Sequence, residues 1–159
     1  MKKSLGVKTI MGKQYESYPF DGKWLAAFGE PSKPFKMLVF GKPKNGKTSM
    51  GMQFCKYLTK FGRVYYNSAE EGDSKTMQQA MINAKMDEIP DGRFMLGDRD
   101  SLSDMIEKLK KNHANFVFID SRDYMKLTTD NWKLLTSTFP RKSFILICWE
   151  QSGKPLGKY

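Results

Sequence analysis

The sequence predicts an α/β fold in which a mostly parallel sheet of about five strands is covered by helices on both faces. Two observations lead to this class. Short apolar runs alternate along the chain with segments whose apolar residues recur at helical spacing, a pattern typical of parallel sheets with crossover helices. The apolar runs are also continuous, as strands buried on both faces require. The expected fold is therefore a three-layer α/β domain.

The regular pattern begins near residue 36 and indicates five strands. The expected strands are 37–40, 64–66, 93–96, 115–119 and 143–148. Helical spacing is seen at 48–60, at 73–85, from residue 101 onward and at 130–138. Ser101 begins the third of these helices, because Asp104 follows it at the spacing of a capping box. Ligands of such sheets lie beyond the carboxyl ends of the strands, so the polar residues there are the functional candidates.

The composition indicates which partners and which cell compartment suit the chain. Its 159 residues suit one domain of ordinary size, and 27 Lys and Arg against 17 Asp and Glu give a formal charge of +10, which attracts polyanions such as nucleic acid. Cys55 and Cys148 lie in apolar runs without a CxxC pair, so we expect buried free thiols in a reducing compartment. No segment approaches the ~20 apolar residues of a membrane helix, and the N-terminus lacks a signal-peptide pattern. We expect a cytoplasmic protein that makes no use of a membrane.

Residues 41–48 match the phosphate-binding consensus GxxxxGK[ST] in full, between an expected strand and an expected helix. Gly41 and Gly46 permit a tight turn whose N–H groups cradle phosphate oxygens, and the helix N-terminus favours the anion. Lys47 is expected to reach the β and γ phosphates, and the Thr48 hydroxyl to ligate Mg²⁺. The expected ligand is therefore Mg-ATP. Its predicted binding residues are Gly41, Lys42, Pro43, Lys44, Asn45, Gly46, Lys47, Thr48 and Ser49.

Acidic residues follow two later strands. The second strand is followed by Glu70 and Glu71, and the fourth ends on Asp120. In nucleotide kinases an aspartate usually ends the strand after the phosphate-loop helix, and here that position carries no aspartate. In this chain, further strands are expected between the phosphate loop and Asp120. That arrangement is found in ATPases that use a separate glutamate to activate water.

Taken in order, several segments resemble those of RecA-like ATPases, especially the RadA/Sms and DnaB-helicase branches and the short recombinases of phages. The segments are 64–71 (VYYNSAEE), 118–121 (FIDS, like a Walker B strand), 144–151 (FILICWEQ, like the sensor strand) and 153–158 (GKPLGK, like a segment near a DNA-facing loop). The resemblance covers roughly residues 25–158. It implies a RecA-like P-loop core over residues 25–159, minimal or truncated at its C-terminus, preceded by an N-terminal extension over residues 1–24.

The resemblance also implies residue roles. Glu70 would be the general base that polarises the attacking water, with Glu71 as the alternative, and Asp120 would hold Mg²⁺ through water. The other interpretation of the glutamate pair is a solvated acidic turn. Trp149 stands where the family has a polar γ-phosphate sensor, and Gln151, two residues on, is the candidate replacement. With Lys47, the predicted catalytic residues are therefore Glu70, Glu71 and Gln151.

Two loops at the expected ligand edge mix cations with an aromatic residue, a combination that tracks a phosphate backbone and stacks bases. The nucleic-acid candidates are Arg122, Tyr124, Lys126, Lys154 and Lys158. The other interpretation is a set of solvated loop charges. The predicted function is Mg-dependent ATP hydrolysis on single-stranded DNA, in a homo-oligomeric ring or filament, during recombination, annealing or replication. The alternatives are a small-molecule kinase and a non-enzymatic, nucleotide-gated interaction module, the latter favoured by Trp149.

Overall fold

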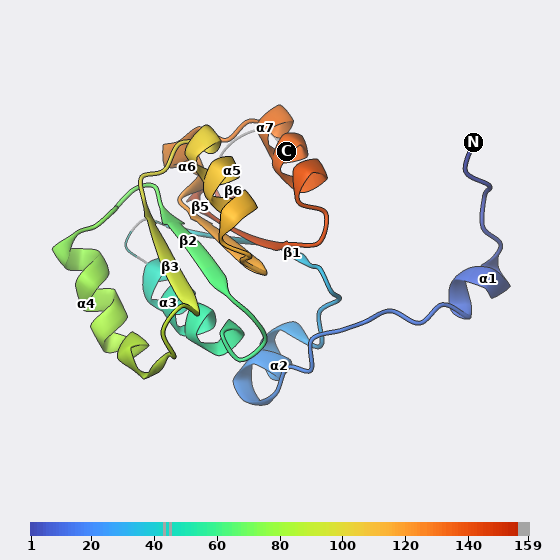
Figure 1. The fold of residues 1–159 in the computed structure, drawn as a ribbon, viewed down its shortest axis with the longest axis horizontal. Helices are drawn as coiled ribbons and strands as arrows, with labels where there is room; N and C mark the ends of the chain where they lie inside the picture. Colours follow the sequence, from blue (N-terminus) through green and yellow to red (C-terminus); the bar gives the residue numbers. More distant parts are fainter. Residues whose placement is uncertain (43, 45, 156–159) are drawn as a thin grey trace. The chain divides into compact units, whose positions relative to one another are not determined.

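A computed structural model describes residues 1–42, 44 and 46–155, and the chain separates into two units, Met1–Pro34 and Phe35–Tyr159. The first unit contains α1 (Val7–Met11) and α2 (Gly22–Phe28) (Figure 1). An antiparallel bridge between Ser17 and Ser32 closes the segment that contains α2. The domain boundary expected after residue 24 lies inside α2 and stays a prediction.

The second unit is built on one sheet in the order β1-β5-β4-β2-β3. These five strands are parallel, and the short β6 pairs with β5 in the antiparallel sense. Their bounds are β1 (Lys36–Gly41), β2 (Val64–Ser68), β3 (Phe94–Asp98), β4 (Phe116–Asp120), β5 (Ser143–Gln151) and β6 (Lys154–Pro155). The predicted parallel α/β sheet is confirmed.

Helices cover both faces of this sheet. They are α3 (Lys47–Leu58), α4 (Lys75–Asn83), the 3-10 helix η1 (Met86–Glu88), α5 (Leu102–Lys111), α6 (Arg122–Met125) and α7 (Thr129–Thr138). The Ser101–Asp104 capping box expected from the sequence begins α5. Figure 1 shows α3 and α4 on one side of the sheet and α5 and α7 on the other, so the domain has the three layers predicted.

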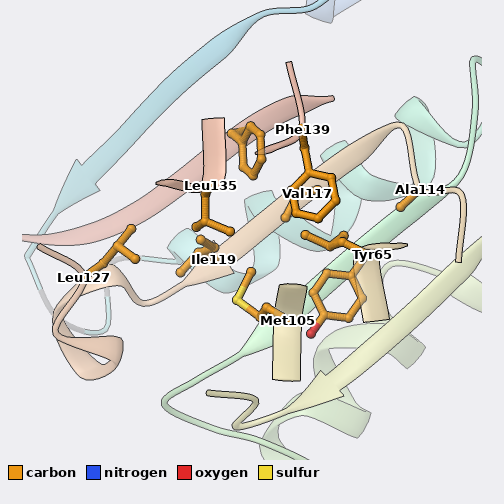
Figure 2. Packing of buried hydrophobic residues seen from close by; sticks show 10 residues of the cluster. Tyr65, Met105, Ala114, Val117, Ile119, Leu127, Leu135 and Phe139 are labelled. Atoms are coloured by element: carbon orange, nitrogen blue, oxygen red, sulfur yellow. The ribbon is translucent and has the colours of Figure 1, made fainter. Parts of the chain in front are cut away.

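Two apolar cores hold the layers together. On one face, Tyr65, Val117 and Ile119 of the sheet pack with Met105 of α5 and Leu135 of α7 (Figure 2). On the other face, the Phe118 ring lies 6.0 Å from the Phe54 ring of α3 and 5.5 Å from the Tyr66 ring, measured between centroids. Neighbouring residues of β2 therefore serve opposite cores, as the alternation of a strand requires.

The edge strand β1 differs from the expectation of full burial. Leu38 is 39% exposed and Phe40 44% exposed, although their run is as apolar as those of the central strands. The reason is position, because β1 ends the sheet order and pairs in register with β5 alone among the strands of that path. Cys55 and Cys148 are buried and form no disulfide bond, as predicted. Within the described residues, no helix is long and apolar enough to cross a membrane.

Candidate active site

Strand register brings the predicted functional segments to one edge of the sheet. Gly41 at the end of β1 is paired with Trp149 of β5. Asp120 at the end of β4 is paired with Ser68 at the end of β2. The phosphate-loop segment, the Glu70 turn and Asp120 therefore meet beyond the carboxyl ends of the strands, where ligands of such sheets bind.

The phosphate-loop segment turns into α3 at Gly46, whose φ of 73° is in the left-handed region that glycine tolerates. The Lys47 ammonium donates to two carbonyl oxygens at the start of the segment, to Gly41 at 3.0 Å and to Lys42 at 2.6 Å. Lys42, Lys44 and Ser49 are exposed. The predicted residues Pro43 and Asn45 lie outside the described residues. Lys47 is thus held by the first two carbonyl oxygens of the segment.

Asp120 is 6% exposed and receives two hydroxyl donors. Thr48 Oγ1 donates to Asp120 Oδ2 at 3.1 Å, and the Tyr66 hydroxyl donates to the same oxygen. Burial raises the pKa of Asp120, against the opposing effect of these two hydrogen bonds and of the Lys47 charge. A threonine hydroxyl and a carboxylate in contact are the hard oxygen ligands that Mg²⁺ prefers. These residues therefore fit a bound Mg²⁺ ion.

Ser68 adds an unsatisfied polar group beside this pair. Its hydroxyl is buried and has no hydrogen-bond partner among the residues that the structure describes. The neighbouring Ala69 N–H donates to the Asp120 carbonyl oxygen at 2.6 Å, which fixes the end of β2 against the end of β4. Buried hydroxyl groups normally have a hydrogen-bond partner, so Ser68 is an exception at this edge of the sheet.

Glu70 lies next to Asp120, and its backbone N–H is 3.3 Å from the Asp120 carbonyl oxygen. Glu70 is partly buried. Burial raises the pKa of Glu70, as do the charges of Asp120 and Glu71, while the Trp149 side chain and the Lys47 charge lower it. The structure therefore brings Glu70 into electrostatic range of Lys47 and Asp120.

Glu71 is held differently. Its backbone carbonyl accepts a hydrogen bond from Arg99 Nη2 at 2.7 Å. Its charge raises the pKa of both Glu70 and Asp120, so it also lies within electrostatic range of the site.

The nucleic-acid candidates fall at two neighbouring places. Tyr124 on α6 is 55% exposed, and Lys126, which ends α6, and Lys154 in β6 are exposed. Arg122 opens α6 and lines an apolar hollow with Leu127 and Trp132. Lys158 lies outside the described residues, as does the side chain of Gln151, whose backbone pairs with Lys154. α6 is tied to β5, because Asp123 Oδ2 accepts from the Trp149 N–H at 2.7 Å.

The contact between Tyr66 and Asp120 was not foreseen from the sequence. Tyr65 and Tyr66 are consecutive in β2, and only the sheet register shows which of them faces Asp120. The peptide bond between Asp120 and Ser121 is cis.

The backbone is similar to that of a KaiC-like protein from the hyperthermophilic archaeon Pyrococcus horikoshii. The TM-score is 0.60 at 18% sequence identity, over 80% of this chain and 67% of that one. No protein-family model matches the sequence, and no curated protein matches it. The likeness and the strand order show a RecA-like P-loop NTPase fold, which is consistent with nucleotide binding. The branch within that fold stays a prediction.

Proposed function

We propose that this chain binds Mg-ATP at the Gly41–Thr48 segment and hydrolyses it. The observation that carries the proposal is the 3.1 Å contact between Thr48 and Asp120, in a site that Lys47 and Glu70 also reach. This set supplies a cation for the phosphates, two oxygens for a metal ion and a carboxylate for water. Each lies at the carboxyl edge of the sheet.

The reaction that these residues support is attack of water on the γ phosphorus. The water oxygen bonds to phosphorus, the bond to the bridging oxygen of ADP breaks, and the Glu70 carboxylate accepts the water proton. Lys47 exchanges the carbonyl oxygens of Gly41 and Lys42 for phosphate oxygens and stabilises their charge. Bound Mg²⁺ would neutralise further charge on the phosphates, held by Thr48 and Asp120.

Turnover of ATP tests this proposal. Glu70→Gln is expected to keep nucleotide binding and to lower kcat about 100-fold or more, because the proton acceptor is removed. Lys110→Gln, an exposed substitution on α5, is the control. Normal turnover by Glu70→Gln would remove Glu70 from this role. Transfer of the phosphoryl group to a metabolite would favour a kinase, and binding without turnover would favour a nucleotide-gated module.

We further propose that the chain acts on single-stranded DNA as a homo-oligomer. The support is the charge of +10 and the exposed Tyr124, Lys126 and Lys154 beside the candidate site. Turnover should rise with single-stranded DNA, and the stimulation should fade as salt increases. Joint substitution of Lys126 and Lys154 by alanine should abolish the stimulation, while Lys110 and Lys111 replaced by alanine should not. Unchanged turnover and sedimentation on adding DNA would contradict this part.

A further inference from the structure

The turn that carries Glu70 follows β2, whose carboxyl end lies between those of β3 and β4. Ser68, the last residue of β2, is paired with Asp98 of β3 on one side and with Asp120 of β4 on the other. The first half of the turn is held from the β4 side, because the Ala69 and Glu70 amides donate to the Asp120 carbonyl oxygen at 2.6 and 3.3 Å. The second half of the turn is held from the β3 side.

Arg99, the residue that follows β3, contacts this second half. Its Nη2 donates to the Glu71 carbonyl oxygen at 2.7 Å, and its backbone N–H donates to the Ser68 carbonyl oxygen at 3.2 Å. Its Nη1 lies 3.3 Å from Asp98 Oδ1. A guanidinium presents its donors in a fixed, planar fork. One side chain therefore joins the backbone of the turn to the end of β3.

Asp98 and Gly72 complete the connection. The same Asp98 Oδ1 accepts a hydrogen bond from the Asp73 N–H at 2.8 Å. The Gly72 N–H donates to the Ser68 carbonyl oxygen at 3.0 Å. Gly72 has a φ of 60°, and a side chain at this position would overlap both the Arg99 guanidinium and the Asp98 carboxylate. The glycine therefore lets the turn lie directly against these two side chains.

We propose that Arg99 is a positioning residue, which holds the turn after β2 against the end of β3 and so keeps Glu70 in place beside Asp120. This inference rests on the proposed function, in which Glu70 takes the proton from water. Loss of the Arg99 side chain would release the Glu71 carbonyl group and leave Asp98 without its cation. A displacement of about 1 Å at a reacting group can lower a rate about 100-fold. Arg99 belongs to none of the motifs that the sequence indicates.

Hydrogen exchange of single backbone amides tests these contacts in the full chain without nucleotide. Arg99→Met keeps an unbranched side chain at a residue whose φ of 54° strains arginine and methionine alike. The Gly72 and Asp73 amides should exchange about tenfold faster in this variant, because the turn opens locally. The Ala69 amide, which donates to the Asp120 carbonyl oxygen, should keep its rate. Unchanged exchange of Gly72 and Asp73 overturns the proposal, whatever the enzymatic activity.

Arg93 offers a matched control at the other end of β3. It precedes the strand as Arg99 follows it, and its Nη1 also donates to a backbone carbonyl oxygen, that of Thr59, at 3.2 Å. Arg93→Met should leave kcat and the exchange of the Gly72 and Asp73 amides unchanged. A similar acceleration in both arginine variants would show a general loss of stability and would overturn the local role of Arg99.

A kinetic cycle tests the consequence for catalysis. Arg99→Met should lower kcat about tenfold with little change in the KM for ATP, because the base is displaced while the phosphate-binding segment is not. In a Glu70→Ala background the same substitution should have no further effect on the residual turnover. An equal loss with and without the Glu70 carboxylate would show that Arg99 acts by another route, against the proposal.

The outcomes separate this inference from the proposed function. If Glu70→Ala stops turnover but Arg99→Met keeps the normal kcat, the positioning role fails and the proposed hydrolysis stands. If Glu70→Ala turns over normally, the proposed role of Glu70 fails and the positioning role fails with it, while amide exchange still decides whether Arg99 holds the turn. Thermal unfolding of each variant confirms that the variant is folded.

Discussion

Two buried aspartates lie on opposite faces of the same sheet, and each receives the hydroxyl of a tyrosine from β2. Tyr65 donates to Asp100, and Tyr66 donates to Asp120. Asp100 is 8% exposed and Asp120 6% exposed. The two tyrosines are consecutive, so the pleat of the strand points them into different layers.

The rest of their surroundings differs. Both carboxylate oxygens of Asp100 accept from the Lys108 ammonium, at 2.6 and 2.7 Å, and its backbone N–H donates to Asn67 Oδ1 at 3.0 Å. Among the described residues, the side-chain hydrogen bonds of Asp120 come from hydroxyl groups. Asp100 is paired with a cation of the chain itself. In the proposed function the cation that pairs with Asp120 is a bound metal ion, so the comparison sets a carboxylate satisfied within the fold against one that we assign to a ligand.

The largest expected effect comes from a substitution at Asp120. Asp120→Asn removes the negative charge but keeps an acceptor for Thr48 and Tyr66, so the fold should survive. Mg-dependent ATP turnover should fall about 100-fold, because the metal ion loses the carboxylate that orients it. Steady-state turnover measured across a magnesium titration checks this. Turnover that matches the unsubstituted protein at low magnesium would contradict it.

The Asp120→Asn substitution should lower turnover but raise the stability of the fold. Because burial raises the pKa of Asp120, the folded chain binds this proton more tightly than the unfolded chain does. The stability that the protonated Asp120 carboxyl contributes is therefore lost as pH rises from the ordinary aspartate pKa of about 3.9 through the raised pKa of the folded state. The Asp120→Asn variant has no such loss, so its advantage in stability should grow over that window. Denaturant unfolding at several pH values without nucleotide measures the difference.

Loss of the Lys108 ammonium that pairs with Asp100 should lower the stability of the fold. Lys108→Met leaves a buried carboxylate without its ammonium and should lower the free energy of unfolding by about 2 kcal/mol, less than a fully buried pair because the Lys108 side chain is 49% exposed. Lys110→Met is the matched control, because its pair with Glu107 spans 3.7 Å between exposed groups. A similar loss for the two variants would remove the distinction. Nucleotide affinity should not change in either.

The smallest effect comes from the two tyrosines. Tyr65→Phe and Tyr66→Phe each remove a donor to a buried carboxylate and should cost about 1–2 kcal/mol without ligand. With saturating Mg-ATP, the loss in Tyr66→Phe should shrink, because the metal ion stabilises the Asp120 charge, while the loss in Tyr65→Phe should stay the same. Thermal unfolding of both variants with and without Mg-ATP tests this. An equal response would mean that the two aspartates are alike.

Sequence patterns predicted the sheet, because each central strand is a continuous apolar run. The candidate site residues at the carboxyl edge of the sheet each follow one of these runs. The patterns also single out Gly41–Thr48 and Asp120, since local spacing carries both signals, and the roles of these residues stay predictions. The partners of those residues come from register, which places Tyr66 against Asp120 across 54 residues. The exposure of Phe40 depends on β1 being an edge strand, and no local pattern encodes that position.

The grip of Lys47 on the carbonyl oxygens of Gly41 and Lys42 sets a threshold for ligands. Any phosphate that takes the ammonium must first replace two hydrogen bonds that the chain already makes to itself, and only the surplus appears as affinity. A nucleoside monophosphate offers few oxygens for that exchange, whereas in the proposed function a triphosphate would also reach the N–H groups at the start of α3 and the hydroxyl of Thr48. We therefore expect the chain to bind a nucleoside triphosphate more tightly than the monophosphate.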